Sequence, residues 1–271
     1  MRDELVEEVL ARLAVERPAP DLAGLRSVYA SWCRSVPFDN TLKLIHTVEG
    51  LSGPLPGSTA ESFFGKWLEH GTGGTCWAGN GGLYELLAEL GFVVERALAT
   101  MLPRPDLQGP NHGSVIVTID GSRYIADASI LSGEPIRILE RGREDAAGLL
   151  PRIAWLEDKP AVIWRMLTAP DGFPCRFDRI GASWDEWDAL HQRTSAWSPF
   201  NYELNIRLQR GSESIGAATG QRFVFQADGS LAASPLDGAE RTRFLVEDIG
   251  ISEGVALRVP PDRPIPPRPT S

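Results

Sequence analysis

A glycine-rich turn that leads into a helix constrains this chain most. Residues 71–77 read Gly-Thr-Gly-Gly-Thr-Cys-Trp, and leucines at helical spacing follow until Gly91. The pattern predicts a helix that begins at or just before Cys76 and ends before Gly91. Free N–H groups and the dipole at a helix start favour a thiolate, and the glycines let another group approach closely. A lone cysteine is more often a small buried residue, so the glycine-rich turn is what favours a nucleophile here.

The first ninety or so residues are predicted to be helical. Apolar side chains recur at helical spacing over residues 5–13, over 22–32 after a capping Asp21, and over 60–68. Pro37 ends the second of these segments and presents Phe38 on a turn.

After Gly91 the pattern changes to strands. Residues 92–101 and 114–119 are rich in β-branched and apolar side chains, and prolines at 103, 105 and 110 mark the loop between them. Asp120-Gly121 is a strong signal for a two-residue hairpin, so residues 123–127 are predicted to be the returning strand.

This hairpin places a histidine and an aspartate on one face. If the loop has only two residues, Asp127 lies opposite Ser114, and His112 lies two residues along the strand from Ser114. Side chains alternate with a period of two, so His112 and Asp127 are diagonal neighbours within hydrogen-bonding reach. A one-residue bulge would reverse this parity. With Cys76, the pair matches a nucleophile, a base and a group that orients the base.

Several segments, in this order, resemble the arylamine N-acetyltransferase family. They are Val-Pro-Phe-Asp-Asn at 36–40, Gly-Gly-Thr-Cys-Trp at 73–77, Asn-His-Gly at 111–113, Ala-Asp-Ala at 126–128 and Thr-Ser-Ala-Trp-Ser-Pro-Phe at 194–200. The resemblance extends from about Asp21 to Leu257. In that family a cysteine, a histidine and an aspartate form a catalytic triad, which the resemblance assigns to Cys76, His112 and Asp127.

The resemblance implies an α+β fold with a cysteine-protease or transglutaminase-like core. Residues 1–91 are expected to form a helical bundle that carries the nucleophile, and residues 92–200 an antiparallel β-barrel-like domain that carries His112 and Asp127. Residues 201–259 are expected to form an α/β lid, followed by a proline-rich tail at 260–271 that is extended and laid on a surface.

The resemblance also implies an acyltransferase that works by a ping-pong mechanism. Acetyl-CoA or another acyl thioester would acylate Cys76, and a small-molecule amine would then accept the acyl group. No permanently bound cofactor is expected, and an acyl carrier protein is an alternative donor. Phe38, Trp77 and Ser129 are expected to lie against the substrate.

Two departures from the family pattern concern the acceptor pocket. Ala78-Gly79 replaces the usual Glu or Gln after the aromatic residue, and Ala-Ser-Ile-Leu at 128–131 replaces a glycine-rich run that contains an aromatic. We therefore expect an acceptor other than a simple arylamine, or a bulkier acyl group. An amide synthase and a thiol hydrolase or transglutaminase-like enzyme are the alternatives, because the same triad serves both.

Composition excludes several other classes of protein. A net charge of −9 and a pI near 5.1 argue against broad nucleic-acid binding. An odd number of cysteines, three, forms no disulfide framework, and the sequence contains neither a signal peptide nor a membrane-length apolar run. We expect a cytoplasmic protein. The four histidines have no metal-site spacing, so no metal is expected.

The remainder of the chain is less informative. Five tryptophans (155, 164, 184, 187 and 197) are interpreted as part of a sheet or barrel wall, and Cys175 is interpreted as lying in a turn. Strands are predicted at 203–208 and 222–226, and a helix at 238–248. Arginines 207, 210, 222, 241 and 243 are candidate ligands for CoA phosphates, although such residues usually lie on a solvated face.

Overall fold

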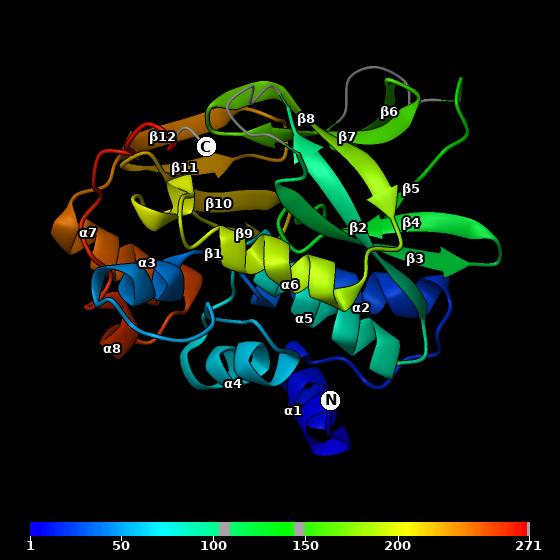
Figure 1. Ribbon diagram of the computed structural model, residues 1–271, viewed down its shortest axis with the longest axis horizontal. Coiled ribbons are helices and arrows are strands. Elements are labelled where there is room, and N and C mark those ends of the chain that lie inside the picture. The colour runs from blue at the N-terminus through cyan, green and yellow to red at the C-terminus, as the bar shows by residue number, and fades with distance from the viewer. Residues whose placement is uncertain (103–108, 144–149, 270–271) are drawn as a thin grey trace.

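Helices dominate the first ninety residues of the computed structural model, which describes residues 1–102, 109–143 and 150–269. They are α1 (Asp3–Leu13), α2 (Leu22–Ser35), α3 (Thr41–Val48), α4 (Ala60–His70) and α5 (Cys76–Glu89) (Figure 1). The predicted helices are confirmed, including the Asp21 cap of α2, whose carboxylate accepts a hydrogen bond from the Gly24 N–H at 2.8 Å. The prediction lacks α3, an eight-residue helix whose N-cap residue, Asn40, makes no side-chain capping hydrogen bond; Asp39 accepts hydrogen bonds from the Thr41 N–H and hydroxyl.

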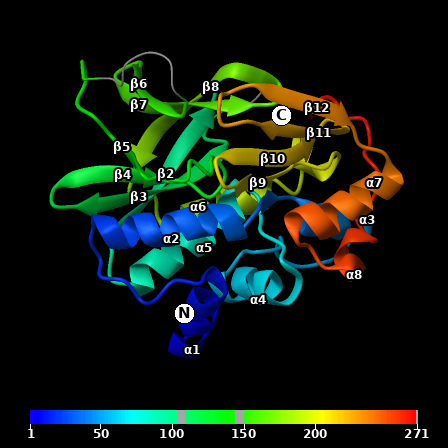
Figure 2. The ribbon, with the colours of Figure 1, turned by 180° about the vertical axis from the view of Figure 1, so that it is seen from behind.

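An aromatic cluster joins these helices. Trp32 of α2 stacks on Phe63 of α4 at 5.8 Å between ring centres and meets the edge of Phe64 at 6.0 Å. Rings in these arrangements each add about 0.5–1.5 kcal/mol beyond their burial. The first eight residues of α5, Cys76–Leu83, are all buried, and α5 packs against the strands that follow it. In the view from behind, α2 lies in front of α5 (Figure 2).

A seven-stranded antiparallel sheet follows in the order β5-β4-β3-β2-β8-β7-β6. Its strands are β2 (Val93–Met101), β3 (His112–Ile119), β4 (Ser122–Ala126), β5 (Ile136–Arg137), β6 (Arg152–Leu156), β7 (Lys159–Met166) and β8 (Ala169–Ile180). The edge strands β5 and β6 contact each other, so the sheet nearly closes on itself, and the expected barrel-like domain is confirmed. The predicted hairpin register is also confirmed, because Ile119 pairs with Ser122 and Val115 pairs with Ala126.

A second sheet contains five strands in the order β1-β9-β10-β11-β12. Its strands are β1 (Phe38–Asp39), β9 (Ile206–Arg210), β10 (Glu213–Ala218), β11 (Gln221–Phe225) and β12 (Leu231–Pro235). Because β1 pairs with β9, the helical part of the chain contributes one strand to the C-terminal sheet. The helix predicted at 238–248 is α7 (Gly238–Arg243) continued by a π-helical turn, Phe244–Ile249, and α8 (Glu253–Ala256) follows.

Two interpretations of the region from 134 to 198 are wrong. Trp184 and Trp187 lie on a helix, α6 (Trp184–Arg193), which begins at a Ser183 cap. Cys175 lies inside β8 and is fully buried, and burial raises the pKa of its thiol well above the usual range. Trp187 and His191 of α6 are buried and lie four residues apart, whereas Trp184 and Asp185 are exposed, so the buried face has the period of a helix and not of a strand.

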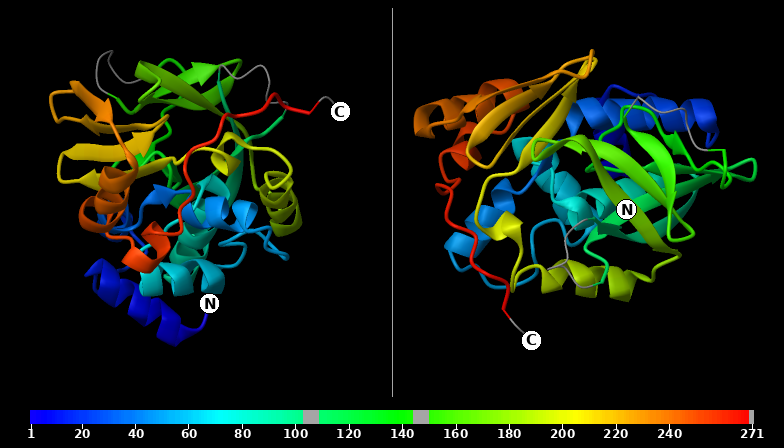
Figure 3. Two further views of the ribbon diagram at one scale, coloured as in Figure 1. Left: turned by 90° about the vertical axis from the view of Figure 1, so that its left-hand side faces the viewer. Right: turned by 90° about the horizontal axis from the view of Figure 1, so that it is seen from above.

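The structure also places most of the remaining predicted segments. Residues 260–269 are extended and lie on the protein surface as predicted (Figure 3). Of the predicted proline loop, Pro103 and Pro105 lie outside the described residues. Among the residues that the structure describes, no helix is long and apolar enough to cross a membrane.

Candidate active site

The glycine-rich turn holds the start of α5 against the segment at 36–40. The Gly73 N–H donates to the Asp39 carboxylate, the Asp39 N–H donates to the Gly74 carbonyl at 3.2 Å, and Gly74 forms a bridge with Phe38. A Cβ at position 73 would lie 1.7 Å from the Pro37 carbonyl oxygen, so only glycine fits there. These contacts fix the position of Cys76, the first residue of α5.

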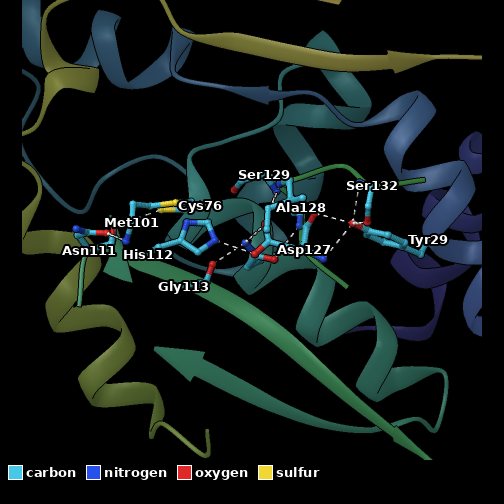
Figure 4. Close-up of polar contacts among 12 residues, drawn as sticks. Tyr29, Cys76, Met101, Asn111, His112, Gly113, Asp127, Ala128, Ser129 and Ser132 are labelled. Atoms are coloured by element: carbon cyan, nitrogen blue, oxygen red, sulfur yellow. Dashed lines mark hydrogen bonds and ion pairs between the residues drawn. The ribbon is translucent and has the colours of Figure 1, made fainter. Parts of the chain in front are cut away.

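His112 and Asp127 form the predicted hydrogen bond. His112 begins β3, Asp127 follows β4, and the distance from His112 Nε2 to Asp127 Oδ2 is 2.7 Å (Figure 4). The parity argument holds because the hairpin contains no bulge. Both residues are almost fully buried, so little water competes with the interaction.

Burial and charge act on this pair in opposite directions. Burial opposes the charge on His112, but the Asp127 carboxylate and the neighbouring Cys76 outweigh it and raise the pKa of His112 to about 10. Burial likewise favours a protonated Asp127, but the imidazolium charge and several hydrogen bonds hold the pKa of Asp127 below its usual range. The pair is therefore an ion pair in which the imidazole is held in a charged state.

Two residues that the sequence analysis missed hold Asp127 in place. Asn80 Nδ2 donates to the Gly113 carbonyl at 2.7 Å and to Asp127 at 3.4 Å, and the Tyr29 hydroxyl donates to the Asp127 carbonyl at 2.8 Å. Asn80 follows Cys76 by four residues, so both lie on one face of α5. A polar residue at that spacing inside a buried helix was an available signal. The sequence contains no such signal for Tyr29, because its partner, Asp127, is distant in sequence.

Cys76 lies beside His112 at the floor of a cavity. Its sulfur is 4.0 Å from the Asn111 carbonyl oxygen, and Figure 4 shows it next to the His112 ring. The cavity has a volume of about 440 Å³, and its lining includes both Cys76 and His112. That volume is within the range of small-molecule sites.

The three residues expected against the substrate all line this cavity. Phe38 meets the edge of Phe200 at 5.5 Å, and Trp77 meets the edge of Trp187 at 5.0 Å. The Ser129 hydroxyl is buried and has no hydrogen-bond partner among the described residues. Figure 4 shows it on the side of Asp127 that faces Cys76. A buried hydroxyl without a partner costs free energy.

Only one of the five candidate arginines lines the cavity. Arg207 does so, with its guanidinium 5.1 Å from the Trp164 ring centre. Arg210 and Arg222 pair with Asp248, and Arg241 pairs with Asp262, so these three serve structural ion pairs. Arg193 and Arg268, which the sequence analysis did not single out, also line the cavity.

Lys43 of α3 is a buried cation whose charge interacts with Cys76. Only 5% of the residue is exposed, and its Nζ donates to the Thr194 hydroxyl at 2.8 Å. Burial lowers the pKa of Lys43 to about 7, while Cys76 acts in the opposite direction. Burial and the Lys43 charge together lower the pKa of His191 to about 3. The sequence signal for a buried lysine is that Lys43 lies inside an otherwise apolar run at 42–45.

Comparison with known proteins finds similarity to N-acetyltransferases. Residues 21–147 match the model of a family described as N-acetyltransferase. An arylamine N-acetyltransferase of Mycolicibacterium smegmatis is 35% identical over 125 residues, which are 44% of this chain and 43% of that relative. The resemblance to the arylamine N-acetyltransferase family is confirmed.

Solved arylamine N-acetyltransferases share the fold over nearly the whole chain. The Mycobacterium marinum enzyme superimposes with a TM-score of 0.77 at 21% sequence identity. The superposition covers 94% of this chain and 98% of the M. marinum chain. The Salmonella typhimurium enzyme superimposes with a TM-score of 0.75 at 16% sequence identity, over 96% of this chain and 98% of the S. typhimurium chain. The arylamine N-acetyltransferase fold therefore extends beyond the aligned sequence, which spans less than half of the curated relative.

The two departures from the family pattern contact each other in this structure. A Cβ at Gly79 would lie 3.3 Å from the Ala128 Cβ, so α5 and the turn after β4 pack closely here. A larger residue at 79 would push away the turn that carries Ser129.

Across the described residues, no three or more histidine, cysteine or acidic side chains cluster as a metal site would require.

Proposed function

We propose that this protein transfers an acetyl group from acetyl-CoA to an amine through a thioester on Cys76. The observation that carries the proposal is the buried His112–Asp127 pair at 2.7 Å, which shares a cavity with Cys76. A solved relative from Mycobacterium marinum is in complex with CoA, and the curated relative is an arylamine N-acetyltransferase, which supports CoA as the carrier. The comparisons give no support to a carrier protein, so the proposal names CoA.

In the first half-reaction, the proton of the Cys76 thiol already resides on His112, which is held as an imidazolium, and the sulfur attacks the acetyl carbonyl carbon. A carbon–sulfur bond forms to Cys76, the bond to the CoA sulfur breaks, and the imidazolium returns its proton to the departing CoA thiolate. Because Asp127 engages Nε2, the other ring nitrogen, Nδ1, is the one available to Cys76. The free backbone N–H groups at the start of α5 stabilise the oxyanion of the tetrahedral intermediate.

In the second half-reaction, an amine attacks the thioester on Cys76. The carbon–nitrogen bond forms, the bond to Cys76 breaks, and His112 moves the amine proton to the sulfur. Exchange of one thioester for another keeps the acyl group activated, so the amine needs little help from a base. Asp127 holds the imidazole in the required tautomer throughout.

The acceptor is proposed to differ from a simple arylamine. The close contact between Gly79 and Ala128 positions the turn that carries Ser129, which lines the cavity and whose buried hydroxyl has no partner among the described residues. An acceptor or acyl group with a hydrogen-bonding group would satisfy that hydroxyl. Ser129→Ala should therefore raise KM for such a substrate by about 5- to 30-fold, the equivalent of about 1–2 kcal/mol for one hydrogen bond, and should leave simple anilines unaffected.

The experiment that tests the function is CoA release from acetyl-CoA, with and without a panel of amines. We expect one rapid release per chain without an amine, turnover when an amine is present, and neither in Cys76→Ala. Steady release without any amine would indicate a thiol hydrolase. Turnover of simple anilines at rates equal to those of the best other amines would reject the proposed acceptor.

A further inference from the structure

The C-terminal segment of residues 260–269 runs extended over the protein surface (Figure 3). It is anchored at two places and contributes Ile265, Arg268 and Pro269 to the lining of the cavity. At the first, the Arg263 N–H donates to the Tyr202 carbonyl at 2.9 Å, and its guanidinium donates to the Asn201 carbonyl at 2.7 Å. Next to it, the Asp262 carboxylate accepts a hydrogen bond from the Leu204 N–H at 2.8 Å and pairs with Arg241 at 2.9 Å. These contacts bind the segment to the loop that leads into β9.

The second anchor is Trp197. Its indole Nε1 donates to the Pro266 carbonyl at 3.1 Å, and the Arg268 guanidinium lies 5.9 Å from its ring centre. Trp197 itself lines the cavity. The anchor therefore joins the segment directly to the cavity wall.

The prolines of this segment stiffen it. Prolines occupy positions 260, 261, 264, 266, 267 and 269, and each restricts the backbone, so holding the segment extended costs little conformational entropy. Arg263 and Pro266 make anchoring contacts, Ile265 and Pro269 line the cavity, and Arg268 both lines the cavity and contacts the Trp197 ring.

We propose that residues 264–269 form a fixed wall of the cavity that limits the size of the groups that reach Cys76. The same cavity is lined by aromatic side chains that include Trp164, Phe173 and Phe223. The wall selects flat or slender apolar groups that fit between these rings and Ile265, and it excludes bulky ones. That such groups are acyl groups and amines rests on the proposed function, whereas the wall itself is a property of the cavity.

The test measures access to Cys76 without acyl transfer. N-ethylmaleimide and N-(1-pyrenyl)maleimide carry the same reactive group on a small and a bulky body. Cys33 and Cys175 are fully buried, and Cys76→Ala gives the background labelling. In a chain that ends after Arg263, which retains the first anchor, we expect the pyrenyl-to-ethyl rate ratio at Cys76 to rise about tenfold or more.

Two full-length variants make the test independent of the truncation. Ile265→Trp should lower the same ratio about tenfold by filling the cavity side of the wall. Pro261→Ala, which lies before the wall and outside the cavity lining, should match wild type. Thermal melting shows whether the truncated chain folds; if it does not, Ile265→Trp decides. An unchanged ratio in Ile265→Trp, or in a folded truncated chain, overturns the proposal. A chain that labels as predicted but forms no acetyl-enzyme would reject the proposed function and retain the wall.

Discussion

Replacing Asp127 by Asn removes the charge that holds His112 in its charged state. The pKa of His112 is raised from its ordinary 6.5 to about 10, and at about 1.4 kcal/mol for each pH unit this favours the imidazolium by about 5 kcal/mol. Without the carboxylate, burial still disfavours the charge, so the pKa of His112 falls back toward or below its ordinary value. Asn has the same shape as Asp, so the cavity should be preserved.

The substitution also reverses the imidazole tautomer. Asp127 Oδ1 accepts hydrogen bonds from the Ser129 and Ile130 N–H groups, and an Asn oxygen would keep that role. Its NH₂ group would then face His112 Nε2 and donate to it, so the ring proton would move to Nδ1. An Nδ1–H cannot accept the proton of Cys76, and we expect acetyl transfer to fall on the order of 10⁴-fold.

The assay is the rate at which iodoacetamide alkylates Cys76 between about pH 5 and 9. In wild type the imidazolium persists up to a pH of about 10, so the rate should change little with pH. In Asp127→Asn the rate should be lower at acidic pH and should rise as pH increases. Urea unfolding checks that the variant is folded. A folded Asp127→Asn with the wild-type rate and pH profile would refute the reasoning.

Three further predictions concern stability. The pKa of Lys43 is lowered from 10.5 to about 7, so between these values the unfolded chain binds a proton that the folded chain does not. The free energy of unfolding of wild type should therefore rise with pH relative to Lys43→Met by up to about 1.4 kcal/mol per pH unit in this window. If urea unfolding gives the same difference in free energy of unfolding between wild type and Lys43→Met at pH 7 and at pH 9, this prediction is wrong. Gly113→Ala places a Cβ 2.4 Å from the Trp187 ring and 2.7 Å from the Trp77 ring, and should destabilise by about 1–3 kcal/mol, measured by thermal melting. Tyr29→Phe leaves the buried Asp127 carbonyl without its hydroxyl donor and should destabilise by about 1–3 kcal/mol; an unchanged midpoint in urea would reject this contact as stabilising.

The parts of the site that could be predicted are those encoded locally. The Asp120-Gly121 turn fixed the hairpin register, and the alternation of side chains then placed His112 beside Asp127. The helix start at Cys76 followed from leucine spacing and the glycine-rich turn. Each of these inferences depends only on neighbours in sequence or across one hairpin.

The residues that were missed act through contacts distant in sequence. Lys43 meets Thr194, Tyr29 meets Asp127, and the tail at Pro266 meets Trp197. Such pairings depend on how the two sheets and the helices pack, which no local period records. The abundance of aromatic residues between 155 and 197 favours a sheet, whereas the buried Trp187 and His191 of α6 have the spacing of a helix.

The measurement that tests the central claim most directly is the intact mass of the protein after brief mixing with acetyl-CoA. The account predicts one added acetyl group on wild type, located on Cys76 by peptide mapping, absent from Cys76→Ala and discharged by an amine. A chain that gains no acetyl group, or gains it on another residue while Cys76 remains free, would contradict the account.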